Sequence, residues 1–278
     1  MNRTTNAIGQ SALVLLMVCA MPFLAFGVSP DTVDPAIILD AMGDRDQGNQ
    51  QTAIMTLVVE DSSGRRRTRV LKTRTLRSDD KSQTWQLMRF ESPADVRGTT
   101  LLTHDFKDGA KQDDQWLYLP SLKKPTRIAN SEKSGSFMGT DLSYSDMTSK
   151  DSKDYDLKML KSSVTVAGET CWLIEARPRT AKAKEETGYV KTKFWISKRM
   201  LAPIQAKMWV REGKKIKYMK FSGYKEFKDK GNTFFSVSRI RAWTKRNKNT
   251  ESTTELVFSD LKFSQSAVKR GDFDPSRL

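Results

Sequence analysis

Apolar and polar residues alternate along most of the chain, and a period of two is typical of β-strands with one buried face. The segment TAIMTLVVE (52–60), the turn DSSG and the segment RRRTRVLKTRTLR (65–77) together predict an antiparallel hairpin. Similar segments follow at short intervals as far as the last strand-like stretch, STTELVFSDLKFS. The pattern therefore predicts a mainly β protein with one extended antiparallel sheet of about ten to twelve strands, curved or partly closed.

Two stretches depart from this alternation. Asp34 and Pro35 precede AIILDAMGDRD and predict a short helix near residues 35–45, because Asp is a preferred N-cap and Pro fits the first helical turn. Residues 130–154 are rich in Ser, Gly and Asp with isolated apolar residues, which indicates an irregular loop with a helical turn.

The N-terminal residues 1–27 combine one basic residue with a long apolar run and small residues near Gly27. This pattern is typical of a cleaved secretory signal peptide. A transmembrane anchor is the alternative, but Pro22 interrupts the run and the acidic VSPDTVDP follows it instead of a basic flank. We therefore predict an exported protein whose mature part is a single domain, residues 28–278.

The formal net charge of +15 predicts a preference for anionic surfaces. The basic segment 65–77 could be read as a nucleic-acid stripe, but its bases alternate with apolar residues in strand register and no RNA-recognition motif accompanies them. A solvated cationic sheet face is the preferred interpretation. Its expected partners are anionic phospholipid headgroups or an acidic protein, and no nucleic acid is expected.

The sequence contains few residues that could support catalysis. His104 is the single histidine, and Cys171 is the one cysteine outside the predicted signal peptide. His104 beside Asp105 could serve as a general base, and Cys171 as a nucleophile, but a structural histidine and a buried thiol are the more common roles for such strand residues. We predict neither an enzyme, nor a metal site, nor a cofactor.

Several strands carry one consistently apolar face. Phe194 and Ile196 share a face of the segment 188–197, and Met208 shares a face with Ala206 in the segment 202–212. These residues could form the ordinary core of a sandwich or barrel. Alternatively, the curved sheet keeps an apolar concavity open for an acyl chain, to which flexible Met side chains adapt.

Three motifs resemble the LolA-like outer membrane lipoprotein-sorting family in order and spacing. They are FESPADVRGTTLLTHDF, DDQWLYLPSLKKPTRI and SGSFMGTDLSYSDM, and the resemblance extends over nearly all of residues 30–278. It is strongest to the branch often found alongside RND/MMPL-type exporters. The resemblance implies a periplasmic half-open β-barrel, covered by helices or loops, whose apolar interior holds acyl chains of a lipid or lipoprotein, with no enzyme activity and no cofactor. The loop around SGSFMGTDLSYSDM, near residues 130–150, is the expected mobile cover.

We expect the binding site to combine cavity-facing strand residues with residues of the cover. Alternation places Trp85 with Leu87, and Trp116 with Tyr118, on shared faces, although either face of the WLYLP strand could line the cavity. The predicted cavity residues are Trp85, Leu87, Trp116, Tyr118, Phe194, Ile196 and Met208, and Phe137 and Met138 are predicted to close over them.

Three functions remain open at this stage. The first is a periplasmic carrier or chaperone for an acylated cargo. The second is an accessory protein that docks on an RND/MMPL-type inner-membrane exporter through its cationic face. The third, a hydrolase of lipid or cell wall, has little support because the chain offers so few catalytic groups.

Overall fold

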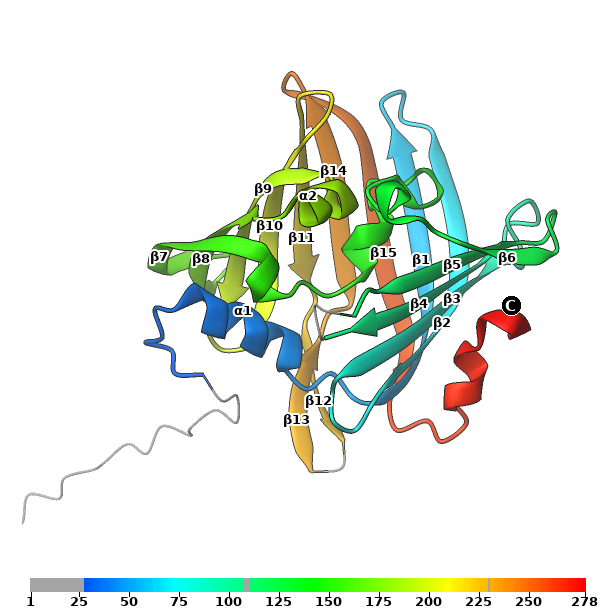
Figure 1. The fold of residues 1–278 in the computed structure, drawn as a ribbon, viewed down its shortest axis with the longest axis horizontal. Coiled ribbons are helices and arrows are strands. Elements are labelled where there is room, and N and C mark those ends of the chain that lie inside the picture. Colours follow the sequence, from blue (N-terminus) through cyan, green and yellow to red (C-terminus); the bar gives the residue numbers. More distant parts are fainter. Residues whose placement is uncertain (1–27, 108–110, 230) are drawn as a thin grey trace, which may run out of the picture.

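A computed structural model describes residues 28–107, 111–229 and 231–278. Within these residues the fold is dominated by one large antiparallel sheet that curves strongly and does not close into a barrel (Figure 1). The predicted signal peptide, residues 1–27, lies outside the described residues. The prediction of a mainly β, half-open barrel is confirmed.

Thirteen of the strands in the described residues pair side by side into this sheet. In order of pairing they are β6 (Lys124–Arg127), β5 (Asp114–Leu119), β4 (Thr100–Phe106), β3 (Gln83–Ser92), β2 (Arg66–Arg77), β1 (Gln50–Asp61), β15 (Asn249–Lys262), β14 (Arg239–Arg246), β11 (Lys215–Ser222), β10 (Ala202–Val210), β9 (Tyr189–Ser197), β8 (Glu169–Pro178) and β7 (Tyr155–Val166). The strands β12 (Lys225–Asp229) and β13 (Asn232–Ser236) form a separate hairpin.

The predicted helix and hairpin both form where the sequence places them. Helix α1 (Pro35–Asp44) begins at Asp34, whose Oδ1 accepts a hydrogen bond from the Ala36 backbone N at 2.8 Å. Strands β1 and β2 pair in the expected hairpin, with Met55 opposite Leu71. A second helix, α2 (Ala181–Thr187), was not predicted, and it ends at Gly188 in the left-handed conformation that glycine favours.

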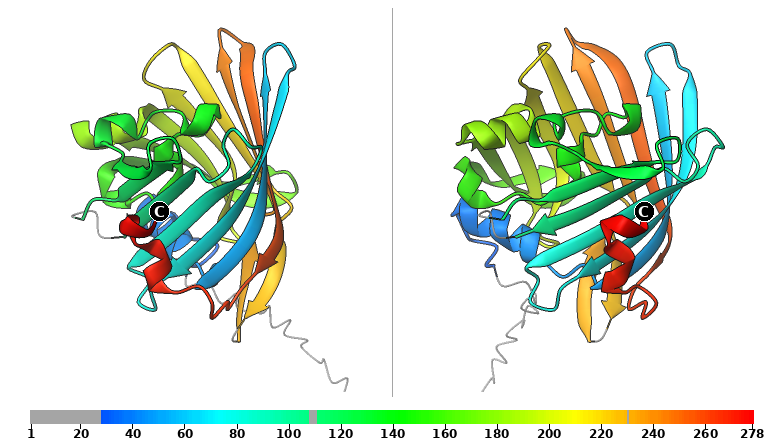
Figure 2. Two further views of the ribbon diagram at one scale, coloured as in Figure 1. Left: turned by 90° about the vertical axis from the view of Figure 1, so that its right-hand side faces the viewer. Right: turned by 45° about the vertical axis from the view of Figure 1, so that its right-hand side comes forward.

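Apolar residues pack on both faces of the sheet. The inner face carries the main apolar cluster, which includes Met55, Met88, Met208 and Leu256. The outer face of β3, β4 and β5 is covered by the C-terminal segment, whose Val268 and Phe273 pack with Trp85 and Leu102. Figure 2 shows this C-terminal segment lying outside the sheet. It contains the short 3-10 helices η5 (Arg270–Phe273) and η6 (Pro275–Arg277).

The predicted cover is present as four 3-10 turns and their connections. They are η1 (Asn130–Glu132), η2 (Phe137–Gly139), η3 (Tyr144–Met147) and η4 (Ser152–Asp154). Contrary to the expected mobile loop, the segment is anchored to the sheet. The Asp141 carboxylate accepts hydrogen bonds from Ser252 Oγ at 2.7 Å and Thr254 Oγ1 at 2.9 Å, both on β15.

Candidate ligand-binding cavity

A cavity of about 630 Å³ lies between the inner face of the sheet, helix α1 and the cover segment. This volume is within the range of about 300–1,000 Å³ that is usual for small-molecule sites. Helix α1 contributes Leu39 and Met42, and the cover contributes Leu142, Met147 and residues 148–151. The elements that enclose the cavity are therefore far apart in the sequence.

One wall of the cavity is apolar. It is built by inward-facing side chains of β9, β10, β11, β14 and β15, namely Phe194, Ala206, Met208, Met219, Phe221, Ile240, Leu256 and Phe258. Alternation along the strands places these residues on one face of the sheet. Such a surface is suited to a flexible hydrocarbon chain, because burying apolar area contributes roughly 25 cal/mol per Å² and Met side chains adapt to irregular ligands.

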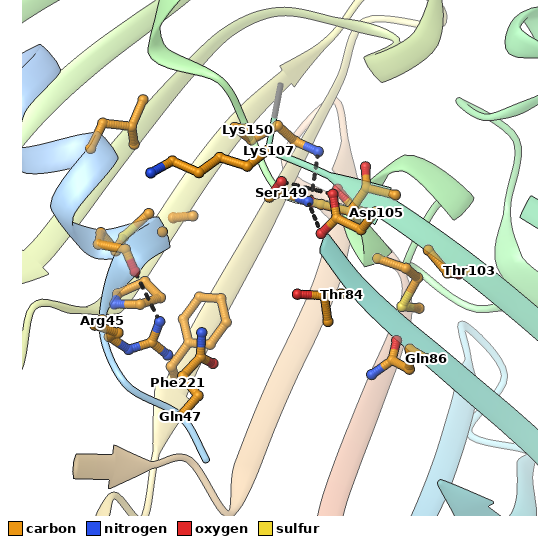
Figure 3. Close-up of a pocket in the computed structure, with 18 of the residues that line it drawn as sticks. Arg45, Gln47, Thr84, Gln86, Thr103, Asp105, Lys107, Ser149, Lys150 and Phe221 are labelled. Carbon is orange, nitrogen blue, oxygen red and sulfur yellow. Dashed lines mark hydrogen bonds between the residues drawn. The ribbon is translucent and has the colours of Figure 1, made fainter. Parts of the chain in front are cut away.

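The opposite wall is mostly polar, with Arg77 and Asp105 as its charged residues. Strands β1 to β4 present hydroxyl and amide side chains to the cavity, namely Gln51, Thr73, Thr75, Thr84, Gln86 and Thr103. Figure 3 shows Thr84, Gln86 and Thr103 together on this side, with Phe221 across from them. The cavity is consequently amphipathic, and a bound molecule can place a hydrocarbon part and a polar part against different walls.

Charged side chains surround the cavity near helix α1 and the cover. The Lys107 Nζ lies 2.7 Å from Asp44 Oδ2, and Asp105 accepts hydrogen bonds from the backbone N and the Oγ of Ser149 (Figure 3). Lys150 donates to the backbone oxygens of Ser145 and Thr148. Burial lowers the pKa of the Lys150 ammonium, which the neighbouring Asp146 partly offsets.

Two of the predicted site residues, Phe194 and Met208, lie in the cavity wall. Ile196 faces the same side of the sheet but packs below helix α1, in a cluster with Ile38 and Trp172. The prediction of the sheet face therefore fits the structure on β9 and β10.

On β3 and β5 the structure corrects the prediction. Trp85, Leu87 and Trp116 lie on the outer face, in the cluster beneath the C-terminal segment, and Tyr118 shares the face of Trp116. The large aromatic side chains were expected in the cavity, but they fill the layer between the sheet and the C-terminal segment instead. The WLYLP strand turns Leu117 inward, toward the main apolar cluster.

The cover residues Phe137 and Met138 also differ from the prediction. Phe137 is completely buried and packs against Phe90 and Tyr144, with ring centroids 6.0 Å and 5.7 Å away. Met138 packs against the same apolar cluster. Neither residue lines the cavity, which the cover reaches through Leu142 and Met147 instead. Phe137 is therefore a core residue rather than a removable lid.

The candidate catalytic residues have structural surroundings. His104 Nε2 lies 2.8 Å from the Phe273 backbone oxygen, and its ring meets Trp116 edge-on, so it links β4 to the C-terminal segment. Burial lowers the pKa of His104 and raises that of the Cys171 thiol to about 11. No cluster of three metal-ligating side chains occurs among the described residues.

Sequence reasoning missed two arginines that line the cavity, Arg45 and Arg77. Arg77 ends the basic segment that was interpreted as a solvated face, yet its side chain is buried. Strand alternation from Leu71 and Thr73, both buried on the inner face, is the signal that could have placed it there.

Comparison with known proteins places the chain in a family. A family model described as an uncharacterized protein matches residues 82–278. A solved domain from Vibrio parahaemolyticus, named as an outer membrane lipoprotein-sorting protein, is 28% identical, with a TM-score of 0.73 over 86% of this chain and 95% of that one. A DUF1329 family protein from Desulfovibrio piger is 26% identical, with a TM-score of 0.75 over 87% of this chain and 97% of that one.

A LolA superfamily protein from Nitrosomonas europaea shares the fold at 16% identity, with a TM-score of 0.63 over 89% of this chain and 100% of that one. No protein of curated function matches the chain. In the part of the chain that the structure describes, no helix has the length and apolar character needed to cross a membrane. The sheet topology and the two relatives above one-quarter identity agree with the resemblance found in the sequence, and the chain belongs to the LolA-like family.

Proposed function

We propose that the protein is a periplasmic carrier that binds the acyl chain of a lipid or lipoprotein in its half-barrel. The observation that carries this proposal is the cavity with one continuous apolar wall, formed by eight side chains from five strands. Two relatives with the same fold are named for lipoprotein sorting and for the LolA superfamily, which supports the same class of function.

The protein acts by binding and not by chemistry in this proposal. Among the described residues, His104 and Cys171 both lie away from the cavity lining. A carrier needs a site that removes a hydrocarbon chain from water and keeps it soluble during transit. The apolar wall removes the hydrocarbon chain from water, and helix α1 and the cover segment keep the bound chain soluble during transit.

A cationic outer face is proposed as the surface that meets the membrane. It lies on β9, β10, β11 and β14, and consists of Lys191, Lys193, Lys207, Trp209, Tyr218, Lys220, Arg241 and Trp243. Trp209 is contacted by the ammonium groups of Lys191 at 4.2 Å and Lys207 at 4.8 Å, and Tyr218 stacks on Trp243 at 5.2 Å. Lysines with interfacial aromatics suit anionic headgroups.

Lipid occupancy tests the carrier function directly. Protein purified from an envelope fraction should carry lipid in native mass spectrometry, and the delipidated protein should bind a fluorescent fatty acid. Ala206→Phe, which places a ring in the cavity, should weaken this binding at least tenfold, whereas Gln205→Phe on the opposite face of β10 should not. A lipid-free protein that also ignores the fatty acid would exclude the proposal.

A further inference from the structure

Two arginines face the cavity from neighbouring parts of the fold. Arg45 follows directly after helix α1, and Arg77 is the last residue of β2. Both line the cavity, and Figure 3 shows Arg45 beside Gln47 and Phe221, at the edge of the apolar wall. The Arg77 side chain is fixed by hydrogen bonds from Nη1 to the Arg45 oxygen and from Nη2 to the Gly43 oxygen, each at 2.9 Å.

The two guanidinium groups are not fully satisfied by the protein. Arg45 uses Nη1 to donate to the Met42 oxygen at 3.1 Å. The Nε atoms of both Arg45 and Arg77 are buried without a hydrogen-bond partner among the described residues. Arg77 as a residue is only 8% exposed. Buried polar atoms are normally hydrogen-bonded, so two unpartnered donors beside one cavity call for a ligand.

In the part of the chain that the structure describes, neither arginine forms a close ion pair, although the charges of Asp44, Asp46 and Asp105 partly offset the burial of Arg77. No ion pair within 4.0 Å joins either arginine to a carboxylate of the described residues. The nearby carboxylates have other partners, since Asp44 pairs with Lys107 at 2.7 Å, Asp46 accepts from the Gly48 N at 2.8 Å, and Asp105 accepts from Ser149. A guanidinium stays charged at physiological pH, and a buried charge without a partner is costly.

We propose that the cavity selects an anionic amphiphile, whose carboxylate or phosphate oxygens are bound by Arg45 and Arg77 while its acyl chain lies on the apolar wall. This inference rests on the proposed lipid-binding function and narrows the cargo. The acylated N-terminus of a lipoprotein carries no anionic group at its acyl chains. The arginine pair therefore favours a free fatty acid or an anionic phospholipid over a lipoprotein.

The geometry supports this assignment in two ways. A guanidinium presents several donors in one plane and matches the paired oxygens of carboxylate and phosphate. In addition, burial lowers the pKa of both arginines, and the neighbouring positive charge of Arg77 lowers the pKa of Arg45 further. An anion between them would relieve both the burial cost and this repulsion.

The test compares three probes with the same palmitoyl chain at pH 8: palmitate, 1-palmitoyl-glycerol 3-phosphate and uncharged 1-palmitoylglycerol. Each displaces the uncharged fluorophore N-phenyl-1-naphthylamine from the delipidated full-length protein. We expect one or both anionic probes to bind about tenfold or more tightly than the uncharged one, because a hydrogen bond to a charged group is worth about 1.5–3 kcal/mol. Which anionic probe binds more tightly identifies carboxylate or phosphate as the natural group.

Variants then assign the effect to the arginine. Arg45→Gln should remove the preference for the anionic probe and leave 1-palmitoylglycerol unchanged, while Arg45→Lys should keep part of the preference. Lys72→Gln removes an exposed charge from the outer face of β2, outside the cavity lining, and should behave as wild type.

Two results would overturn the proposal. They are equal binding of all three probes by the wild-type protein, or an equal loss for all three in Arg45→Gln, which would mean that Arg45 only supports the fold. Neither result would remove the carrier function, which fails only when none of the probes binds. The wild-type comparison requires no variant, so it stands even where a substitution impairs folding.

Discussion

Lys217 Nζ lies 2.9 Å from Asp146 Oδ2, and both side chains are less than one-tenth exposed. Lys217 is on β11 and Asp146 is in the cover segment, so this buried ion pair fastens the cover to the sheet. Tyr189 completes the group, since its hydroxyl donates to Asp146 Oδ1 at 2.8 Å. Burial alone would raise the pKa of Asp146, but the charge and hydrogen bond of Lys217, the hydrogen bond from the Ser143 backbone N and the charge of Lys150 together lower it.

Replacement of Lys217 by methionine should therefore be strongly destabilising. It leaves Asp146 buried without its counter-charge, and breaking such a pair costs about 3–5 kcal/mol. The exposed pair Lys72–Glu91 provides the matched control, because Lys72→Met should cost at most about 1 kcal/mol. Urea unfolding measures the free energy of unfolding of both variants. Equal small decreases in this free energy would show that the cover is not held by the Lys217–Asp146 pair.

Removal of the Phe273 side chain should show that the outer layer contributes to stability and the cavity to lipid binding. Phe273 is fully buried against Trp85 on the outer face of the sheet, and a Phe-to-Ala change in such a position costs about 3–5 kcal/mol. Phe273→Ala should lower the free energy of unfolding but leave lipid affinity per folded molecule unchanged. In contrast, Phe221→Ala in the cavity wall should reduce lipid affinity. A reduced affinity in Phe273→Ala would contradict the assignment of the two faces.

The carboxyl group of Asp113 should make stability depend on pH. Burial, and next the charge of Asp105, raise its pKa from 3.8 to about 7. The folded protein therefore binds more protons than the unfolded chain between these values, so the free energy of unfolding contributed by this group falls as pH rises from 3.8 to about 7. Above about pH 7 the contribution of Asp113 to the free energy of unfolding is lost completely.

The variant Asp113→Asn tests this dependence, since the amide oxygen can still accept from the Phe106 backbone N. Its thermal midpoint should fall less between pH 5 and pH 8 than that of the wild type, whereas Asp95→Asn on the surface should retain the wild-type fall. An unchanged pH dependence in Asp113→Asn would show that Asp113 is ionised throughout this range.

The cationic outer face should bind anionic vesicles. Vesicles containing phosphatidylglycerol should sediment with the protein, pure phosphatidylcholine vesicles should not, and added salt should weaken the binding. Each lysine near such a surface contributes about 1 kcal/mol, so the double variant Lys207→Glu and Lys220→Glu should bind roughly tenfold more weakly or worse. The same charge change at Lys123 in the β5–β6 turn and at Lys124, the first residue of β6, is the control. Equal losses in both double variants would exclude a specific membrane-facing surface.

The sequence predicted the strands better than their orientation. Alternation located β9 and β10 and their inward residues Phe194 and Met208, because one side of these strands is regularly apolar. On β3 it paired Trp85 with Leu87 but could not show which face they share. The large apolar side chains of Trp85 and Leu87 suggested that their shared face lines the cavity. The C-terminal segment, however, covers the outer face, so that face is apolar as well.

The features that were missed depend on contacts between distant segments. Val268 and Phe273 follow the last strand without any periodic pattern, so their packing against β3 and β4 could not be anticipated. Likewise, Arg77 is buried because helix α1 ends against its guanidinium. Alternation from Leu71 and Thr73 places Arg77 on the inner face, but the helix end that covers it there cannot be read from the local sequence.

Photolabelling with a palmitate analogue that carries a diazirine on its chain tests the central claim, that the half-barrel cavity holds an acyl chain. After irradiation, peptide mass spectrometry should locate the label on the apolar wall, at Phe194, Met208, Met219 or Phe221, and excess palmitate should compete with it. Label on the outer-face peptides that contain Trp85 or Phe273, or labelling that palmitate does not reduce, would contradict the account.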